Sequence, residues 1–202
     1  MAFSVASFIW LLLMGAAEDP LPAPPAFSIL VNGSPLSPHM AAFTAVPGGQ
    51  VLVSCGDSLS WSILDTCGRG REFCFTLPRS HGVFTLTGRA GDVVQEWAVL
   101  VPVDGSRMRT ATLNSYPMGI FGGADAVGRE FIPDGFLELR QTTYNTRLST
   151  HFRVGDFLCT LRGDWPQYMA LDLNLVRKLE ALLEEVRSYY PDARSIHVMS
   201  GF

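Results

Sequence analysis

Seven short runs of β-forming residues, separated by turn residues, fill the first half of the chain and restrict its fold more than any other feature. The runs lie at 27–31, 39–46, 50–55, 59–64, 72–77, 82–87 and 93–101. The turn residues between them include Asn32-Gly33-Ser34-Pro35, Pro47-Gly48-Gly49, Gly56-Asp57 and Gly91-Asp92. Many short strands spaced by about 8–12 residues are typical of antiparallel sandwiches and barrels.

Alternating apolar residues within these runs support half-buried strands. Phe73, Phe75 and Leu77 would share one face of a strand, because successive side chains of a strand point to opposite sides. Trp97, Val99 and Val101 repeat the pattern. We therefore predict a mainly β, immunoglobulin-like sandwich over residues 27–103, in which the Cys…Trp…Cys pattern of antibody domains is only approximate.

The second half of the chain has a different character. Residues 104–135 hold eight glycines and prolines and little periodicity, which predicts a long irregular connector. From residue 136 onward we predict an α+β domain with a strand at 136–139, a short helix near 152–158, a long helix at 172–190 and a strand at 195–199.

The long helix has the clearest pattern in the chain. Asp172 is a suitable N-cap and Pro191 ends the helix. The apolar positions are Leu173, Val176, Leu179, Leu182, Leu183, Val186 and Tyr190, and the charged positions assigned to the opposite face are Arg177, Lys178, Glu180, Glu184, Glu185 and Arg187. Such a face needs partners, and few follow the helix, so we predict that the C-terminal domain over 136–202 is incomplete.

The N-terminus indicates export. Residues 1–17 are mostly apolar and end in small residues, as in a signal peptide, and residues 18–26 form a proline-rich tether. An uncleaved N-terminal anchor is the alternative. Both interpretations place the chain outside the cytoplasm, and we expect a periplasmic or secreted protein with no membrane span after signal cleavage. The net charge of −4 argues against a nucleic-acid partner.

Four cysteines and four histidines are the candidates for metal binding or redox chemistry. Cys55, Cys67, Cys74 and Cys159 lack a C-x-x-C spacing, so we expect packed thiols or one disulfide among the first three. His39 and His81 fall in turns or strand ends and are predicted to be solvated, and His197 lies in the last predicted strand as a buried, hydrogen-bonded residue. His151 and Asp156 are either two zinc ligands or structural residues of a short helix.

Three segments of the second half resemble one known family. "LSTHFRVGDFLC" (148–159), "LDLNLVRKLEALLEEVR" (171–187) and "IHVMSGF" (196–202) follow the order of the zinc D-Ala-D-Ala carboxypeptidase-like peptidases that act on peptidoglycan. That family opens with Ser-x-His-Phe-x-x-x-Asp/Glu-Phe, continues with an amphipathic helix and reaches a strand that ends in Ser-Gly-Tyr-Arg. The matching signature residues, to which we assign a structural role, are Ser149, His151, Phe152, Asp156, Phe157, Ser200, Gly201 and Phe202.

The resemblance implies an exported cell-envelope protein that acts on or binds cell-wall peptides. In the family the zinc ligands follow the Ser-Gly-Tyr-Arg turn, and neither they nor the arginine of the turn occur here. We therefore assign no catalytic and no metal-binding residue, expect no cofactor in this chain although zinc is implied for complete members, and expect a truncated or short form without activity by itself. A non-catalytic envelope adaptor with an immunoglobulin-like domain is the alternative.

Overall fold

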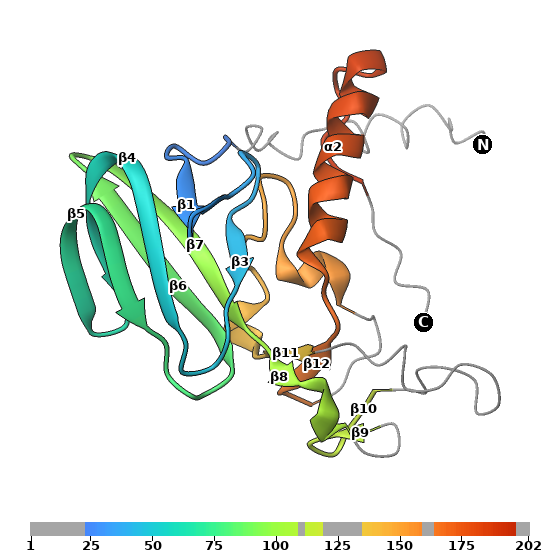
Figure 1. The fold of residues 1–202 in the computed structure, drawn as a ribbon. Coiled ribbons are helices and arrows are strands. Elements are labelled where there is room, and N and C mark those ends of the chain that lie inside the picture. The colour runs from blue at the N-terminus through green and yellow to red at the C-terminus, as the bar shows by residue number, and fades with distance from the viewer. Residues whose placement is uncertain (1–22, 109–111, 119–134, 159–163, 197–202) are drawn as a thin grey trace, which may run out of the picture.

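The computed structural model describes residues 23–108, 112–118, 135–158 and 164–196, and the fold there is mainly β, as predicted (Figure 1). The strands are β1 (Ile29–Val31), β2 (Ser34–Pro35), β3 (Ala42–Thr44), β4 (Gln50–Ile63), β5 (Thr66–Thr76), β6 (Gly82–Ala90), β7 (Val93–Val101), β8 (Val103–Asp104), β9 (Thr112–Leu113), β10 (Tyr116–Pro117), β11 (Gly135–Leu139) and β12 (Gln167–Met169). The helices are the 3-10 turns η1 (Gly105–Arg107), η3 (Gln141–Thr143) and η4 (Val154–Phe157), and the α-helix α2 (Leu173–Tyr189).

The first seven strands form one connected, curled sheet. Its strand order is β2-β1-β4-β6-β7-β3, and β5 pairs with β4. All pairs are antiparallel except β3 with β7, which is parallel. The hairpin between β1 and β2 turns at Asn32 and Gly33, which have φ angles of 49° and 80°. These positive angles are the reason for an Asn-Gly sequence in a two-residue hairpin.

One predicted strand boundary is wrong. Gly56-Asp57 was expected to separate two strands, but β4 runs from Gln50 through to Ile63. The pairing of β4 with β5 shifts register between Ser54 and Leu59. A local bulge therefore accommodates the glycine, and the chain bends there without leaving the sheet.

The concave side of the curled sheet encloses the first hydrophobic cluster. Trp61 stacks on Phe73 with ring centroids 6.2 Å apart and lies 5.9 Å from the ring of Trp97. The predicted alternating faces are confirmed, because Phe73 and Phe75 of β5, Leu77 directly after it, and the three alternating residues of β7 are all buried here. The buried members are Ile29, Phe43, Val51, Val53, Leu59, Trp61, Ile63, Phe73, Phe75, Leu77, Leu86, Trp97, Val99 and Val101.

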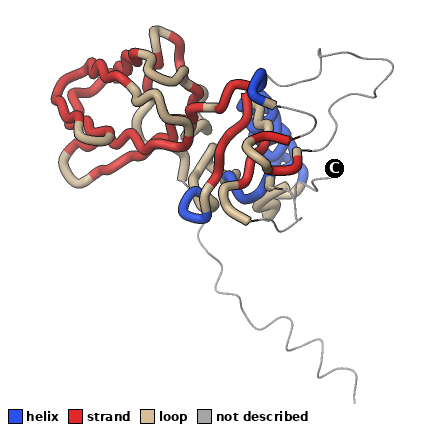
Figure 2. Tube along the Cα trace, turned by 90° about the horizontal axis from the view of Figure 1, so that it is seen from below, coloured by secondary structure: helices blue, strands red, loops and turns tan. Residues whose placement is uncertain are grey.

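A second hydrophobic cluster joins the two halves of the chain. Ala98 and Leu100 of β7 point away from the first cluster and pack with residues of β11, the 148–154 segment and α2. The buried members are Met40, Ala42, Ala98, Leu100, Leu137, Leu139, Leu148, Phe152, Val154, Met169 and Val176. Figure 2 shows the long strands on one side of the molecule and the helices on the other. The strand β7 is thus buried on both faces at the junction.

Helix α2 confirms its predicted ends, but its buried face differs from the prediction. The Asp172 carboxylate accepts a hydrogen bond from the backbone of Asn174 at 2.8 Å. Val176 and Leu183 are completely buried, so the expected shortage of partners is not found on this side. Leu182, in contrast, is 50% exposed. The face turned to the core includes Glu180, which was assigned to the solvated side.

The predicted irregular connector contains regular structure where it is described. Strands β9 and β10 form a hairpin inside it, and β8 pairs with β11 at its two ends. Strands β12, β11 and β8 make a three-stranded sheet, of which β12 was not predicted. For the predicted strand at 195–199, residues 195–196 have no regular structure and the others lie outside the described residues, as does the predicted signal peptide.

The three described cysteines are free thiols, so of the two alternatives the disulfide is not found among them, and Cys55 alone of the three is a partly buried thiol. Cys67 and Cys74 lie seven residues apart on the extended strand β5, which separates them by about 23 Å. Cys55 packs against the first cluster inside the curled sheet, whereas Cys74 is exposed. A disulfide needs Cα atoms within about 7 Å and side chains that face each other. Cys159 lies outside the described residues.

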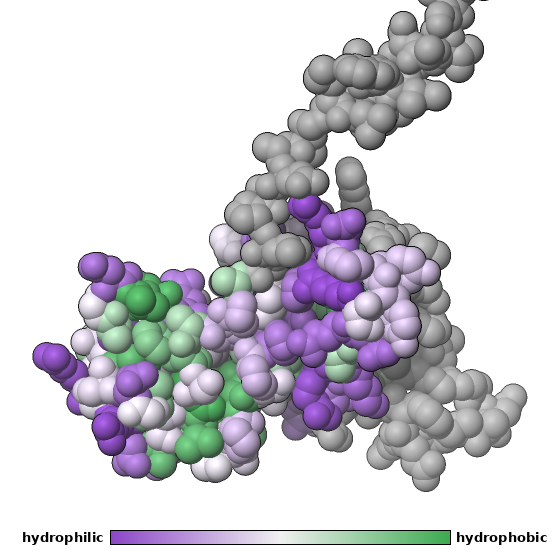
Figure 3. Space-filling model, turned by 90° about the horizontal axis from the view of Figure 1, so that it is seen from above, coloured by the Kyte–Doolittle hydropathy of each residue, from purple (hydrophilic) through white to green (hydrophobic). Residues whose placement is uncertain are grey.

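Seen from above, hydrophobic residues gather on the lobe formed by the curled sheet, and the helical side is mainly hydrophilic (Figure 3). Leu30 of β1 and Leu52 of β4 are 40% and 41% exposed. Leu30 pairs with Ser54, two residues from Leu52, so both side chains lie on the outer face of neighbouring strands.

Candidate functional site

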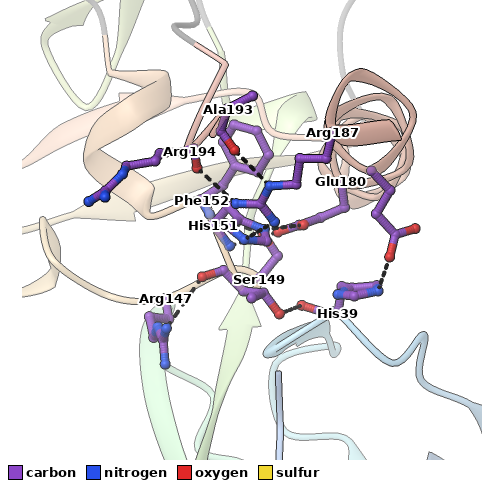
Figure 4. A network of polar contacts seen from close by, with 11 residues as sticks. His39, Arg147, Ser149, His151, Phe152, Glu180, Arg187, Ala193 and Arg194 are labelled. Atoms are coloured by element: carbon purple, nitrogen blue, oxygen red, sulfur yellow. Dashed lines mark hydrogen bonds and ion pairs between the residues drawn. The ribbon is translucent and has the colours of Figure 1, made fainter. Parts of the chain in front are cut away.

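The segment 147–157 is anchored to the first half of the chain. The backbone of Ala41 donates to the carbonyl of Leu148 at 2.9 Å, and Thr150 donates to the carbonyl of His39 at 2.8 Å. The Ser149 hydroxyl accepts a hydrogen bond from the backbone of Phe152 at 3.3 Å. This tight turn directs the His151 side chain toward α2 (Figure 4).

His151 and Glu180 form a buried pair between this turn and α2. The Glu180 carboxylate accepts two hydrogen bonds from His151, from the backbone N–H at 2.8 Å and from ring Nδ1 at 2.7 Å. The side chains are 5% and 3% exposed. Both carboxylate oxygens are therefore occupied by one residue, which holds the turn and the helix in a single relative position.

Arg187 completes the network and determines the tautomer of His151. Its Nη1 lies 2.8 Å from His151 Nε2, and its Nε donates to the carbonyl of Ala193 at 2.7 Å. A guanidinium group can only donate, so Nε2 accepts and the ring proton sits on Nδ1. The neutral imidazole thus links the Glu180 carboxylate to Arg187, and Arg187 ties the chain after α2 back to the helix (Figure 4).

His39 makes a second, more exposed contact with the same helix. Its Nε2 lies 2.8 Å from Glu184, one turn after Glu180, and its side chain is 29% exposed. Its buried Nδ1 has no hydrogen-bond partner among the described residues. His81 is also engaged, with Nδ1 3.0 Å from the carbonyl of Pro102 and Nε2 3.2 Å from Arg107. The prediction of solvated turn histidines is wrong for both, because their partners are distant in sequence.

The other described signature residues have structural contacts. Asp156 accepts a hydrogen bond from the backbone of Arg153 at 2.7 Å and so caps η4. Phe152 is buried, and its ring lies 5.9 Å from that of Phe157. These contacts match the structural alternative for His151 and Asp156. Ser200, Gly201 and Phe202, together with His197, lie outside the described residues.

Zinc does not fit the residues of this network. Both nitrogens of His151 and both oxygens of Glu180 already have partners, and Asp156 turns to its own helix cap. Within the described part of the chain, no group of three or more histidine, cysteine or acidic side chains could hold a metal ion. The network can hold the 149–152 turn and α2 together.

A second polar cluster joins β11, β12 and the turn between β9 and β10. The Tyr168 hydroxyl donates to Glu138 at 3.1 Å and accepts from the Asn114 side chain at 2.9 Å. Burial, reinforced by the Glu138 carboxylate, raises the pKa of Tyr168 above its usual range. At the exposed turn η1, hydrogen bonds from Ser106 lower the pKa of Asp104. The protonated phenol of Tyr168 is thus held between Glu138 and Asn114.

The sequence contained a signal that Glu180 and Arg187 lie on the buried side of α2, which the prediction missed. Glu180 follows Val176 by four positions, and Arg187 follows Leu183 by four. Residues four apart share a helix face, so both charges belonged to the buried side. They were assigned to the solvated face because charged residues are rarely buried, and the rule has exceptions where a charge has a partner.

Comparisons with protein families, with curated proteins and with solved structures found no match to this chain. The resemblance to zinc carboxypeptidases therefore stays a prediction. None of the helices in the described ranges combines the length and apolarity that crossing a membrane would require.

Proposed function

We propose that this chain is an exported cell-envelope protein of the zinc D-Ala-D-Ala carboxypeptidase-like group that binds peptidoglycan stem peptides. The observation that carries the proposal is the order of the segments 148–159, 171–187 and 196–202. The buried pair of His151 with Glu180 supports it, because it makes two of these segments neighbours, as expected of one folding unit. An immunoglobulin-like N-terminal domain, an α+β C-terminal domain and a periplasmic or secreted location are parts of the same proposal.

In the complete family, zinc would polarise the scissile carbonyl and activate water, with a carboxylate as general base. No residue of this chain is assigned to these roles. We therefore propose a binding function for the chain by itself, without cleavage of the stem peptide.

Co-sedimentation with purified peptidoglycan sacculi tests the proposal. The full chain should sediment with intact sacculi and much less with sacculi whose stem peptides have been removed by an amidase. Mass spectrometry of the stem peptides after incubation with zinc should show no shortening. Equal sedimentation with both preparations, or none with either, would contradict peptide binding, and shortened peptides would contradict the assignment of no catalytic residue.

A non-catalytic adaptor is the second candidate, and the exposed pair of Leu30 and Leu52 favours it. Contiguous exposed apolar patches mark surfaces that contact another molecule, and the two leucines lie together on one outer face of neighbouring strands. If the chain is such an adaptor, retention on the cell wall should not depend on stem peptides, and Leu52→Glu should abolish it. Retention that depends on stem peptides and is unchanged by Leu52→Glu would exclude this candidate.

A further inference from the structure

A row of apolar side chains runs along one flank of α2, directly beside its buried face. Leu175, Leu182 and Tyr189 are 47%, 50% and 72% exposed. Leu179 and Val186 lie between them and are half-buried, and Leu179 also packs against the second hydrophobic cluster. We call these five residues the outer stripe. Among the described elements, α2 lies on the side opposite to β4 and β5 (Figure 1).

The spacing of the outer stripe is that of a helix-pairing seam. Its members follow one another at steps of four, three, four and three residues, from 175 to 189. This repeat of 3.5 residues on average keeps a stripe facing a neighbouring helix along its whole length. In heptad terms Leu179 and Val186 occupy position a, and Leu175, Leu182 and Tyr189 occupy position d.

The two flanks of the stripe differ. The flank at position e consists of Val176 and Leu183, which are completely buried in the core of the same molecule. The flank at position g consists of Lys178 and Glu185, which are exposed. Charged pairs between paired helices form at positions e and g. Only the g flank is therefore free to contact a partner helix.

This asymmetry selects one orientation. In a parallel helix pair, position g of one helix faces position e of the other. The residues at position e of α2 are buried in its own core and cannot reach a partner. In an antiparallel pair, g faces g. When Leu179 packs opposite Leu182 of a second copy, Lys178 lies opposite Glu185 of that copy, and the two-fold symmetry repeats the contact. The antiparallel pair thus places two Lys178–Glu185 contacts, one on each side of the two-fold axis, beside the outer stripe.

Neither charge has an opposite partner on its own helix. The residues three and four positions from Lys178 are Asn174, Leu175, Ala181 and Leu182, and those from Glu185 are Ala181, Leu182, Ser188 and Tyr189. Within the described ranges neither residue takes part in an ion pair. The charge complementarity is therefore available to a second molecule.

We propose that α2 is a self-association surface, which binds α2 of a second copy of this chain as an antiparallel pair through the outer stripe. The inference does not depend on the proposed function. The stripe extends over about 21 Å, so the contact is short and the dimer should depend on protein concentration.

Charge exchange at the g flank tests the orientation. Sedimentation equilibrium of the full chain should show a concentration-dependent dimer. Lys178→Glu and Glu185→Lys should each weaken it about tenfold, because two attractive pairs become repulsive. The double variant Lys178→Glu/Glu185→Lys should restore wild-type dissociation. Far-UV circular dichroism should be unchanged throughout, since both residues are exposed. A monomer at all concentrations, or a double variant that stays weakened, would overturn the proposal.

Carbodiimide cross-linking provides an independent test, because Lys178 is the only lysine in the chain. Within one helix, the Cα atoms of Lys178 and Glu185 are about 10 Å apart, and their two side chains can span that distance. Isotope mixing separates the two cases: in a mixture of ¹⁵N-labelled and unlabelled chains, only a link between two copies joins a labelled peptide to an unlabelled one. A dimer that forms without this mixed link would show that another surface mediates association.

Discussion

At the scale of single residues, Glu180 and Glu184 show how burial decides the value of a contact. Both lie on α2, one turn apart, and both contact a histidine from outside the helix. Glu180 is 3% exposed and accepts two hydrogen bonds, whereas Glu184 is 56% exposed. Solvent screens the exposed contact, but a buried donor that loses its acceptor cannot recover a hydrogen bond from water.

We expect Glu180→Ala to lower the free energy of unfolding by about 2–4 kcal/mol, because two buried donors of His151 lose their acceptor. Glu184→Ala is the matched control and should cost less than about 1 kcal/mol. Urea denaturation followed by circular dichroism measures both. Similar losses for the two variants would show that the buried network does not hold α2.

A second residue-scale prediction concerns Tyr168, whose pKa is raised by burial. The unfolded tyrosine ionises near pH 10, below the folded one, so its stabilising contribution is complete below about pH 10 and is lost as pH rises further. Tyr168→Phe should therefore lose less stability than the wild type between about pH 9 and pH 11. Urea midpoints across this range measure the effect. Tyr189→Phe, at a 72% exposed position, should follow the wild type.

At the scale of elements, the curled sheet depends on a close approach of β6 to two tryptophans. A Cβ atom at Gly88 would lie 3.0 Å from Leu59 and Trp97 side-chain atoms and 3.3 Å from Trp61. All three side chains are buried and packed against each other, so they have little room to move. The sequence pattern predicted β6 as a strand but contained no sign that Gly88 sits under the two indole rings.

We expect Gly88→Ala to destabilise the fold by about 1–3 kcal/mol through overpacking. Gly56→Ala is the control, since nothing lies within 4 Å of a Cβ atom at that position. Thermal unfolding followed by tryptophan fluorescence compares the two. If Gly88→Ala were as stable as Gly56→Ala, the tight packing around the indole rings would be refuted.

At the scale of the whole molecule, the second hydrophobic cluster couples the two halves. It includes Ala98 and Leu100 from the curled sheet and Phe152 and Val176 from the second half. Burial of shared apolar surface makes separate unfolding of the halves unfavourable. The division into domains at 27–103 and 136–202 stays a prediction, and the shared cluster determines how it can be tested.

We expect unfolding in urea to show one transition. In a Trp10→Phe/Trp165→Phe variant, the fluorescence of the remaining Trp61 and Trp97 reports on the curled sheet, and ellipticity at 222 nm reports mainly on α2. Because β7 contributes to both clusters, the two signals should have coincident midpoints. Midpoints that differ clearly would indicate two independent folding units.

The sequence by itself determined the local structure: the mainly β first half, the alternating faces of β5 and β7, and the position of α2 with its Asp172 cap. These features depend on periodicity and on turn and cap residues, which act over a few positions. Only the tertiary structure decided which side of α2 is buried, that His39 and His151 contact glutamates about 145 and 29 residues away, and that the three described cysteines stay apart. Such contacts depend on how elements far apart in the sequence pack against each other, and no local sequence pattern specifies that packing.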